Sequence, residues 1–453
     1  MSFTARSWWP WPQKKKQKKK KSARVRPADL AVTLPEAPVV AVERRPVKPA
    51  LGLPRFHTTA ADHVDRERLD PRARERVRLR STFTPAQPVV DPQMFAGRRD
   101  ILETLIRSVE DQRSHVVIFG ERGAGKTSLL RMLSRAAEEA KYIVVYFSCG
   151  ATSDFTETFR AVATEIPLLY HSGISPISSN PEVGTSLLDL LGPGKLTPRL
   201  FGDAAAKLVG TRVIVVLDEF DRAESADFRR DVAELIKTLS DVSARLQLVI
   251  GGVASDLIEL MEHIPSIRRN VAAVRVAAMS DEEVVALVEN GSKMSGVRFD
   301  ADAIEVVVSA ARGSPYLTSL LCHVAGMLAL DAGRVRVDYN DMVRALDDVL
   351  ADFRRRIPTK LAIELDQVAL GIRTGRQGPT GEKGSGAADT GVGNVSAKVL
   401  ETLEKKGALA GVKPAAYALI IDSVTPYLQL KGAREKIFDK AERLQHPAKS
   451  AIA

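Results

Sequence analysis

A glycine-rich segment near residue 120 carries the residue types that bind the phosphates of a nucleotide. Residues 120–127 read Gly-Glu-Arg-Gly-Ala-Gly-Lys-Thr and match the pattern G-x-x-x-x-G-K-[S/T]. Gly123 and Gly125 allow a tight turn whose backbone N–H groups bind anions, and Lys126 reaches the phosphates as a point charge. Thr127 offers a hydroxyl to Mg²⁺. The candidate nucleotide-binding residues of this loop are Gly120, Glu121, Arg122, Gly123, Ala124, Gly125, Lys126, Thr127 and Ser128.

Two carboxylates stand at the end of a strongly apolar segment, residues 213–217. A buried strand that ends in Asp218 and Glu219 needs an explanation, because burying a charge without a partner is costly. In a nucleotide hydrolase the first acid binds Mg²⁺, here together with Thr127, and the second polarises the attacking water. Asp218 is therefore a candidate metal ligand and Glu219 the candidate catalytic base. Asp221 either assists them or caps the following helix.

The elements that must position these residues alternate between strand and helix from about residue 90. Continuous β-branched runs, rather than alternating ones, favour parallel strands that are covered on both faces. The strand–helix alternation predicts a doubly wound α/β sheet. The predicted strands are residues 115–119, 142–148, 212–217, 246–251 and 271–276. The predicted helices of this part are residues 101–109, 127–140, 155–165 and 228–239.

After Met279 the pattern changes to helices only, at residues 281–289, 301–311 and 315–330. A third region follows and contains a glycine-rich stretch with the composition of a loop. A helix at 395–406 and a hairpin, or a strand and turn, at 416–421 and 427–430 together suggest a winged helix-turn-helix. The predicted domains are a basic tail at 1–80, a nucleotide-binding core at 81–278, a helical lid at 279–350 and a winged-helix-like domain at 351–453 with the glycine-rich loop at 371–394.

The basic charge of the chain is concentrated in its first 90 residues. They hold 21 Lys and Arg against 8 Asp and Glu, an excess of 13, so a whole-chain net charge of +10 leaves −3 for the rest. Low hydropathy predicts that residues 1–80 are disordered, with a short surface helix within 66–80. Trp8, Trp9 and Trp11 lie beside a lysine run at 14–21. This Trp-Lys tail binds nucleic acid, contacts an anionic membrane, or is simply solvated.

Composition excludes several other classes of protein. Only two cysteines are present, Cys149 and Cys322, which rules out a disulfide framework or a four-thiolate zinc site. Both are expected to be small core residues. No stretch reaches the ~18 apolar residues of a membrane span, and no secretory leader is recognisable. A reducing, cytoplasmic location is expected.

With both motifs in order, the chain resembles the AAA+ superfamily, and within it the branch of archaeal origin-recognition initiators and STAND-like ATPases. The resemblance covers roughly residues 90–350. Residues 95–98, Phe-Ala-Gly-Arg, resemble the F-x-G-R entry motif near the adenine, so Gly97 and Arg98 are candidate nucleotide contacts. The resemblance implies a P-loop NTPase fold, an AAA+-type parallel sheet flanked by helices with a helical lid, and ATP and Mg²⁺ as cofactors.

The resemblance also implies roles for residues outside the two motifs. Ser255, after the strand at 246–250, stands where the family places a γ-phosphate sensor. Arg268 and Arg269 stand where an arginine finger acts on a neighbouring subunit's nucleotide, or are two surface arginines. Gly313-Ser314-Pro315-Tyr316 resembles the G-x-P element of STAND-type lids, which makes Pro315 a candidate nucleotide contact.

Three functions follow as hypotheses. The first is an ATP-hydrolysing molecular switch, in which the lid moves the C-terminal domain and copies of the ATPase domain self-associate. The alternative is a DNA-associated AAA+ ATPase of replication, transposition or defence, with DNA contacts from the C-terminal domain or the basic tail. The third is a scaffold in which ATP only stabilises the fold; Glu219 argues against it, because a purely structural site needs no water-polarising acid.

Overall fold

The computed structural model describes residues 71–168, 186–254, 269–363, 365–366 and 414–445. The glycine-rich loop, the predicted helix at 395–406 and the Trp-Lys tail lie outside the described residues. So do two of the predicted site residues, which are named with the site below. All the described residues belong to one compact unit of the chain, 58–453.

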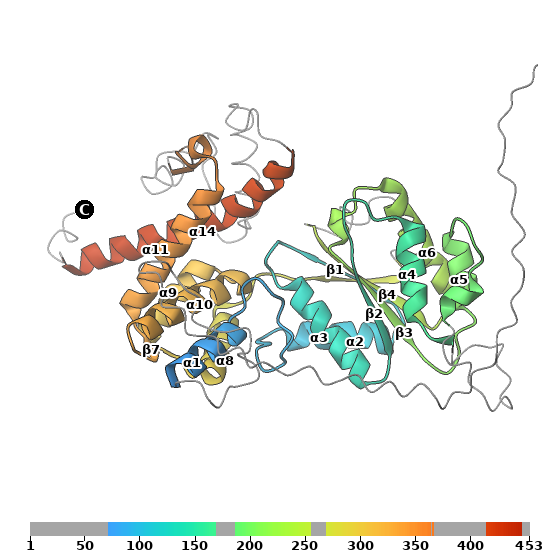
Figure 1. The fold of residues 1–453 in the computed structure, drawn as a ribbon, viewed down its shortest axis with the longest axis horizontal. Helices are drawn as coiled ribbons and strands as arrows, with labels where there is room; N and C mark the ends of the chain where they lie inside the picture. The colour runs from blue at the N-terminus through green and yellow to red at the C-terminus, as the bar shows by residue number, and fades with distance from the viewer. Residues whose placement is uncertain (1–70, 169–185, 255–268, 364, 367–413, 446–453) are drawn as a thin grey trace, which may run out of the picture. The chain divides into compact units, whose positions relative to one another are not determined.

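A five-stranded parallel sheet forms the centre of the first half of the chain (Figure 1). All of its neighbouring strands pair in parallel, in the order β2-β3-β4-β1-β5. This confirms the predicted parallel α/β fold, and each predicted strand is present within two residues of its expected ends. The strands are β1 (His115–Gly120), β2 (Ile143–Ser148), β3 (Val213–Asp218), β4 (Leu246–Val253) and β5 (Val271–Arg275).

Helices cover both faces of the sheet, because alternate side chains of each inner strand point to opposite faces. Val117 and Phe119 of β1 belong to the apolar core on one face, and Val116 and Ile118 belong to the core on the other. The first core is closed by α4 (Phe155–Glu165), the 3-10 helix η2 (Leu187–Leu190), α5 (Pro198–Ala205) and α6 (Ala226–Asp241). The second is closed by α2 (Arg99–Glu110) and α3 (Lys126–Glu139).

His115, the first residue of β1, links sheet stability to pH. Its side chain is buried and its Nδ1 accepts a hydrogen bond from the Leu248 backbone N–H (2.9 Å). Burial lowers the pKa of His115 to about 4, below the 6.5 of an exposed imidazole. The neutral ring therefore contributes stability above pH 6.5, and this contribution falls as pH drops toward 4, because only the unfolded chain takes up the proton.

Replacing His115 by Asn, which keeps an acceptor but cannot titrate, should flatten the pH dependence of stability. Between pH 7.5 and pH 5 the wild type should lose about 2 kcal/mol more unfolding free energy than His115→Asn, as follows from the depressed pKa. Urea unfolding of both proteins at the two pH values measures this difference. Equal losses in the two proteins would show that His115 is not the buried neutral group described.

A helical domain, which we call the lid, makes up most of the second half of the described chain and also includes α1 from its beginning. It has its own apolar core, which includes Leu79 of α1 and Phe83, the residue directly after α1. Phe83 fits against the backbone of Gly291, where any side chain would collide with its ring. Residues 71–80, predicted as part of the tail, thus belong to the packed body. The lid helices are α1 (Pro71–Thr82), α8 (Asp281–Ser295), α9 (Ala301–Ala311), α10 (Pro315–Asp331), α11 (Tyr339–Arg356) and α14 (Pro414–Gln445).

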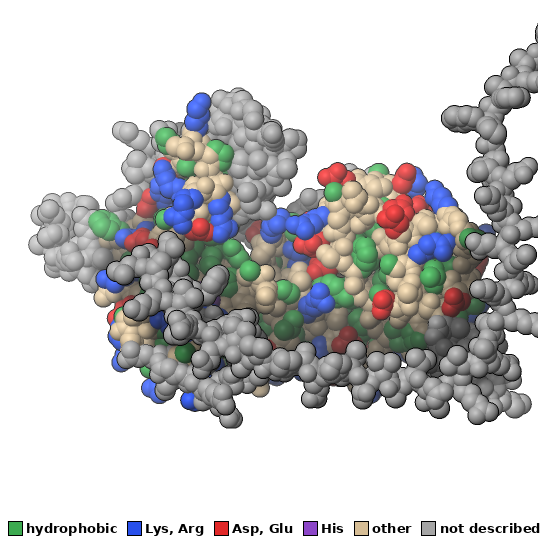
Figure 2. All heavy atoms as spheres, in the orientation of Figure 1, with side chains coloured by type: hydrophobic (Ala, Val, Ile, Leu, Met, Phe, Trp, Pro, Cys, Tyr) green, Lys and Arg blue, Asp and Glu red, His purple; other side chains and the backbone are tan. Residues whose placement is uncertain are grey.

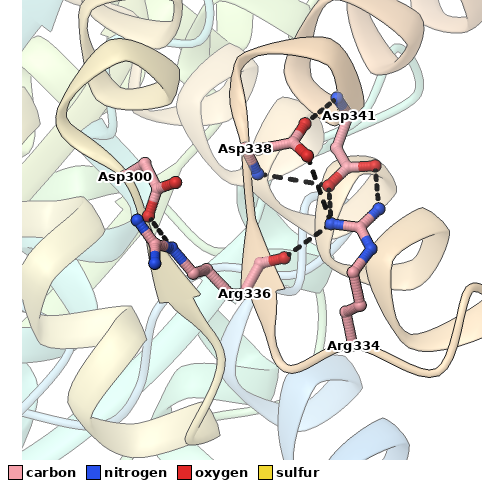
Figure 3. Close-up of polar contacts among 5 residues, drawn as sticks. All are labelled: Asp300, Arg334, Arg336, Asp338 and Asp341. Atoms are coloured by element: carbon pink, nitrogen blue, oxygen red, sulfur yellow. Dashed lines mark hydrogen bonds and ion pairs between the residues drawn. The ribbon is translucent and has the colours of Figure 1, made fainter.

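A network of ion pairs fixes the turn between α10 and α11 (Figure 3). Arg334 holds the buried carboxylate of Asp341 with two hydrogen bonds of 2.7 Å. Asp341 and Asp338 form a capping box at the start of α11. Arg336 pairs with Asp300 (2.5 Å), beside a short parallel pair of strands, β6 (Arg298–Phe299) and β7 (Arg336–Val337). This cluster is fully used in holding lid elements together.

The hairpin predicted at 416–421 and 427–430 is wrong, because residues 414–445 form the single helix α14. Pro426 lies inside this helix. Val424, Tyr427 and Leu430 are buried in the lid core, and this packing stabilises the helix despite the proline. The helix α11 also continues past residue 350, the predicted end of the lid. A wing is therefore absent from residues 414–445, and the winged-helix prediction has no support in the described part of the chain.

No helix among the described residues has both the length and the apolar character required to traverse a lipid bilayer.

Candidate functional site

Residues 120–127, which we call the phosphate loop, lie between the carboxyl end of β1 and the first turn of α3, as predicted. Gly123 (φ 75°) and Gly125 (φ 86°) both adopt left-handed conformations that other residues rarely take. Gly125 is the N-cap of α3, so the positive end of the helix dipole faces the loop. A glycine loop of this kind can direct backbone N–H groups toward an anion at a helix N-terminus, which is an arrangement suited to phosphate.

Lys126 is buried at the base of this loop. Its Nζ donates hydrogen bonds to the backbone oxygens of Gly120 (2.9 Å) and Glu121 (2.8 Å). Burial lowers the pKa of Lys126 to about 8, against the opposing influence of Asp221 and Asp218. A buried ammonium held only by neutral carbonyls is poorly compensated, and an anion at the loop would compensate it.

Thr127 and Ser128 follow in the first turn of α3 and are both half-buried. The Ser128 hydroxyl accepts a hydrogen bond from the Val89 backbone N–H (3.1 Å). It therefore holds the segment that leads from α1 to α2 against α3. Among the described residues, the Thr127 hydroxyl has no such hydrogen bond to a backbone N–H.

Asp218 is the last residue of β3, is 4% exposed, and lies close enough to Lys126 of the phosphate loop for its charge to act on the lysine. Its Oδ1 accepts from the Glu219 backbone N–H (2.8 Å), and its Oδ2 accepts from the Tyr146 hydroxyl (2.6 Å). Burial, followed by the charge of Asp218, raises the pKa of Tyr146, so the hydroxyl remains a donor. The carboxylate is thus oriented by two donors rather than left unpaired.

Glu219 follows in a left-handed conformation (φ 55°) that turns the chain sharply at the end of the strand. Its Oε2 accepts hydrogen bonds from Ser148 Oγ (2.9 Å) and Arg222 Nη1 (2.9 Å). Asp221 does not cap α6, whose N-cap is Ser225. Its Oδ1 accepts from the Val253 backbone N–H (2.8 Å), which ties this turn to the end of β4, and its charge acts on Lys126 together with that of Asp218. The two predicted acids therefore stand together at one strand end.

Arg98 lies under the phosphate loop. Its guanidinium donates to the backbone oxygens of Ala124, in the loop, and of Ala277 (2.8 Å), in the connection from β5 to the lid. Its backbone N–H donates to Glu283 Oε1 (2.9 Å), and Gly97 leaves room for that carboxylate. Burial lowers the pKa of Arg98. Arg98 therefore joins the entry segment, the phosphate loop and the lid.

The lid reaches the phosphate loop through the segment 313–316. A side chain added at Gly125 would come within 3.3 Å of Pro315 Cγ, and one added at Gly123 would come within 3.6 Å of Ser314 Oγ. Ser314 caps α10 through the Leu317 N–H, and Pro315 is the first residue of that helix. The structure therefore brings Pro315 to the loop, as the sequence suggested.

Residues 86–337, more than half of the chain, match the model of a family described as "Novel STAND NTPase 1". The chain belongs to this STAND NTPase family. The match confirms the STAND-like resemblance derived from the two motifs and the lid element. No curated protein sequence matches the chain.

Several solved structures are similar to this STAND NTPase at low sequence identity. Cdc6p from Pyrobaculum aerophilum is 15% identical over 80% of this chain and 98% of its own, with a TM-score of 0.46. The Aeropyrum pernix Orc1 protein in complex with DNA is 16% identical over 76% and 87%, with a TM-score of 0.43. Thermotoga maritima RuvB T158V is 15% identical over 73% and 87%, with a TM-score of 0.44.

Of the predicted sensor and arginine-finger residues, the structure describes Arg269 alone. Ser255 and Arg268 lie outside the described residues. Arg269 is exposed next to Asn270, whose backbone oxygen accepts from the His115 N–H (3.0 Å). It thus lies at the amino end of β1, whereas the phosphate loop follows the carboxyl end. Arg269 does not contribute to the phosphate loop of its own chain.

The donor set of the STAND NTPase fits Mg²⁺ better than a protein-caged metal. Among the described residues, no three His, Cys, Asp or Glu side chains gather as a metal site. Mg²⁺ usually keeps several waters and takes one or two carboxylates plus substrate phosphates. This coordination preference fits the site, which offers one oriented carboxylate, from Asp218, and one hydroxyl, from Thr127, beside a phosphate loop.

Sequence reasoning missed two residues that shape the site, Tyr146 and Glu283. The sequence predicts Tyr146 only as part of the strand at 142–148, because its hydroxyl contact with Asp218 depends on the neighbouring strand. Glu283 is the third residue of α8 and forms a capping box with Ser280, a local signal that was present in the sequence.

Both predicted core cysteines are buried, and burial raises the pKa of Cys149 to about 12.

Proposed function

We propose that this STAND NTPase is a molecular switch that binds ATP with Mg²⁺ and hydrolyses it. The observation that carries the proposal is the meeting of lid and sheet at the phosphate loop. Pro315 and Ser314 of the lid lie against Gly125 and Gly123 of the loop. A nucleotide bound at the loop would therefore contact both the sheet and the lid, and its phosphates would affect the position of the lid.

The residues of the chain divide the work of binding and hydrolysis. The backbone of residues 120–127 and the Lys126 ammonium would bind the phosphates. Thr127 and Asp218 would hold Mg²⁺, which when bound neutralises part of the charge of the β and γ phosphates. Glu219 would orient and polarise the attacking water, since Ser148 and Arg222 hold its carboxylate through Oε2, and no hydrogen bond to Oε1 is present among the described residues.

The contacts of the lid provide a route from the loop to the C-terminal helix. Met279, in the connection from the sheet, donates its N–H to the Gly313 oxygen (2.9 Å). Gln429 of α14 donates to the Ala310 and Ala311 oxygens at the end of α9, just before this segment. A shift of residues 313–316 would therefore alter the contacts of both the connection to the sheet and α14.

Self-association through the ATPase domain is part of the proposal, because Arg269 could reach only the nucleotide of another copy.

DNA binding remains the alternative function, with the basic excess of residues 1–90 as its support. Figure 2 shows Lys and Arg side chains around the end of α11, but the three arginines of its last turn pair with Asp352 and Asp366. We therefore place any DNA contact on the tail, where a membrane contact by the Trp-Lys segment is the competing possibility. We expect a cytoplasmic location.

Hydrogen exchange of the full chain tests the switch. We expect amide exchange in residues 312–317 and 424–437 to differ between Mg·ATP, Mg·ADP and no nucleotide, because the lid contacts the loop and α14 contacts the lid. Exchange that changes only in residues 120–130 would contradict the switch, since the nucleotide would then bind without moving the lid.

The same samples separate the DNA alternative. Duplex DNA added at low salt should leave the exchange pattern unchanged if the switch acts without DNA. Salt-sensitive protection that appears only with DNA would favour the alternative.

A further inference from the structure

The carboxylate of Asp218 is set in a space made by three adjacent strands. Tyr146 of β2 donates to its Oδ2 (2.6 Å), and the Glu219 backbone N–H donates to its Oδ1 (2.8 Å). On the other side, a side chain at Gly251 of β4 would stand 3.2 Å from Oδ1 and would also collide with Leu130. The carboxylate is therefore confined on both sides and held by two donors in one orientation.

Tyr146 is itself fixed by the helix that begins at the phosphate loop. The guanidinium carbon of Arg131 lies 3.5 Å from the centre of the Tyr146 ring, a cation–π contact. Arg131 is one helical turn after Thr127 on α3, so the helix that carries the candidate hydroxyl ligand also holds the tyrosine. A continuous series of contacts thus runs from α3 through Tyr146 to the candidate carboxylate ligand.

We propose that Tyr146 is a positioning residue for Mg²⁺, holding the Asp218 carboxylate in the orientation that binds the metal beside Thr127. This inference rests on the proposed function, because it requires that nucleotide and Mg²⁺ bind at the loop. Mg²⁺ demands near-ideal octahedral geometry, so a carboxylate free to rotate binds it less well. Loss of a hydrogen bond that orients a metal ligand typically costs 10- to 100-fold in metal affinity.

The tyrosine could instead serve only to fill space between β2 and α3. Phenylalanine would fill that space equally well, because it keeps the ring and the Arg131 contact and removes only the hydroxyl. Tyr146→Phe therefore separates positioning from packing. Tyr142→Phe is the matched control: Tyr142 precedes the same strand, and its hydroxyl accepts a hydrogen bond from Arg212 (3.3 Å) at the other end of the sheet.

Binding of a fluorescent ATP analogue to the full chain, titrated with Mg²⁺ from an EDTA-treated start, gives the readout. For Tyr146→Phe we expect unchanged analogue affinity without Mg²⁺ and at least a tenfold rise in the Mg²⁺ concentration that gives the half-maximal effect. Tyr142→Phe should match the wild type in both. The metal-free affinity also reports that the phosphate loop of Tyr146→Phe is intact.

Two outcomes overturn the inference. If Tyr146→Phe needs the same or less Mg²⁺ than the wild type, the tyrosine does not position the metal ligand, and the proposed function stands. If the wild type binds the analogue without any Mg²⁺ effect, the proposed function fails and this inference fails with it.

Discussion

Lys126→Ala should lower the affinity for ATP about 100-fold or more. The lysine is buried at the base of the loop, and among the described residues its ammonium donates hydrogen bonds to the backbone oxygens of Gly120 and Glu121, which are neutral acceptors. Phosphate oxygens would replace neutral acceptors with charged ones, and hydrogen bonds between charged groups are worth about 1.5–3 kcal/mol each. Losing one or two of them corresponds to roughly one to four powers of ten in affinity.

The alanine variant should remain folded, because it removes a buried charge rather than a packed apolar group. Lys207→Ala is the matched control, since Lys207 is exposed on the segment after α5. Equilibrium binding of labelled ATP measures both variants, and their melting temperatures check the fold. If Lys126→Ala binds ATP as tightly as Lys207→Ala does, the loop that contains Lys126 is not the ATP-binding site.

Glu219→Gln should bind ATP normally and hydrolyse it about 100-fold more slowly, or slower still. A positioned general base contributes about 10²- to 10⁴-fold to a rate, and glutamine cannot accept the proton. The amide has the same shape and can still accept hydrogen bonds from Ser148 and Arg222, so the turn after β3 should be preserved. The expected phenotype is therefore a protein that retains bound ATP.

Glu224→Gln provides the control for this second substitution. Glu224 is an exposed carboxylate five residues further along the same connection, and its removal should leave turnover unchanged. Single-turnover phosphate release separates hydrolysis from nucleotide exchange. Equal rates for Glu219→Gln and the wild type would assign the water-polarising role to another group.

The parallel sheet and the phosphate loop were predictable because their signals are local. Residues 213–217 are all aliphatic, which is typical of a strand covered on both faces, and the glycine spacing of residues 120–127 prescribes a phosphate loop. The residues that match the family model, 86–337, include these segments and the lid element at 313–316. Parallel pairing then brought Asp218 to the same edge as the loop.

The C-terminal helix α14 was not predictable in the same way. Pro426 interrupts the segment, and a proline in a helix interior costs about 3 kcal/mol, which favours a break. The spacing of Val424, Tyr427 and Leu430 places them on one side, where they pack in the lid core. Tertiary burial outweighed the local preference of the chain.

Contacts between distant segments account for the rest of what the sequence did not show. Arg98 carried a recognisable motif, but its partner Glu283 lies 185 positions away. Tyr146 carried no motif, and its contact with Asp218 arises only when β2 pairs with β3 in register. The sequence identified which residues carry chemistry, whereas the packing of neighbouring elements determined how they are oriented.

The central claim is that ATP binds at the loop containing Lys126 and is hydrolysed with Mg²⁺. The most direct measurement is phosphate release from ATP by the full chain, with Mg²⁺ or EDTA, for the wild type and Lys126→Ala side by side. We expect the wild type to release phosphate only with Mg²⁺, and the variant to release none above background. Mg²⁺-dependent release that persists in Lys126→Ala, or no release by the wild type at any protein concentration, would contradict it.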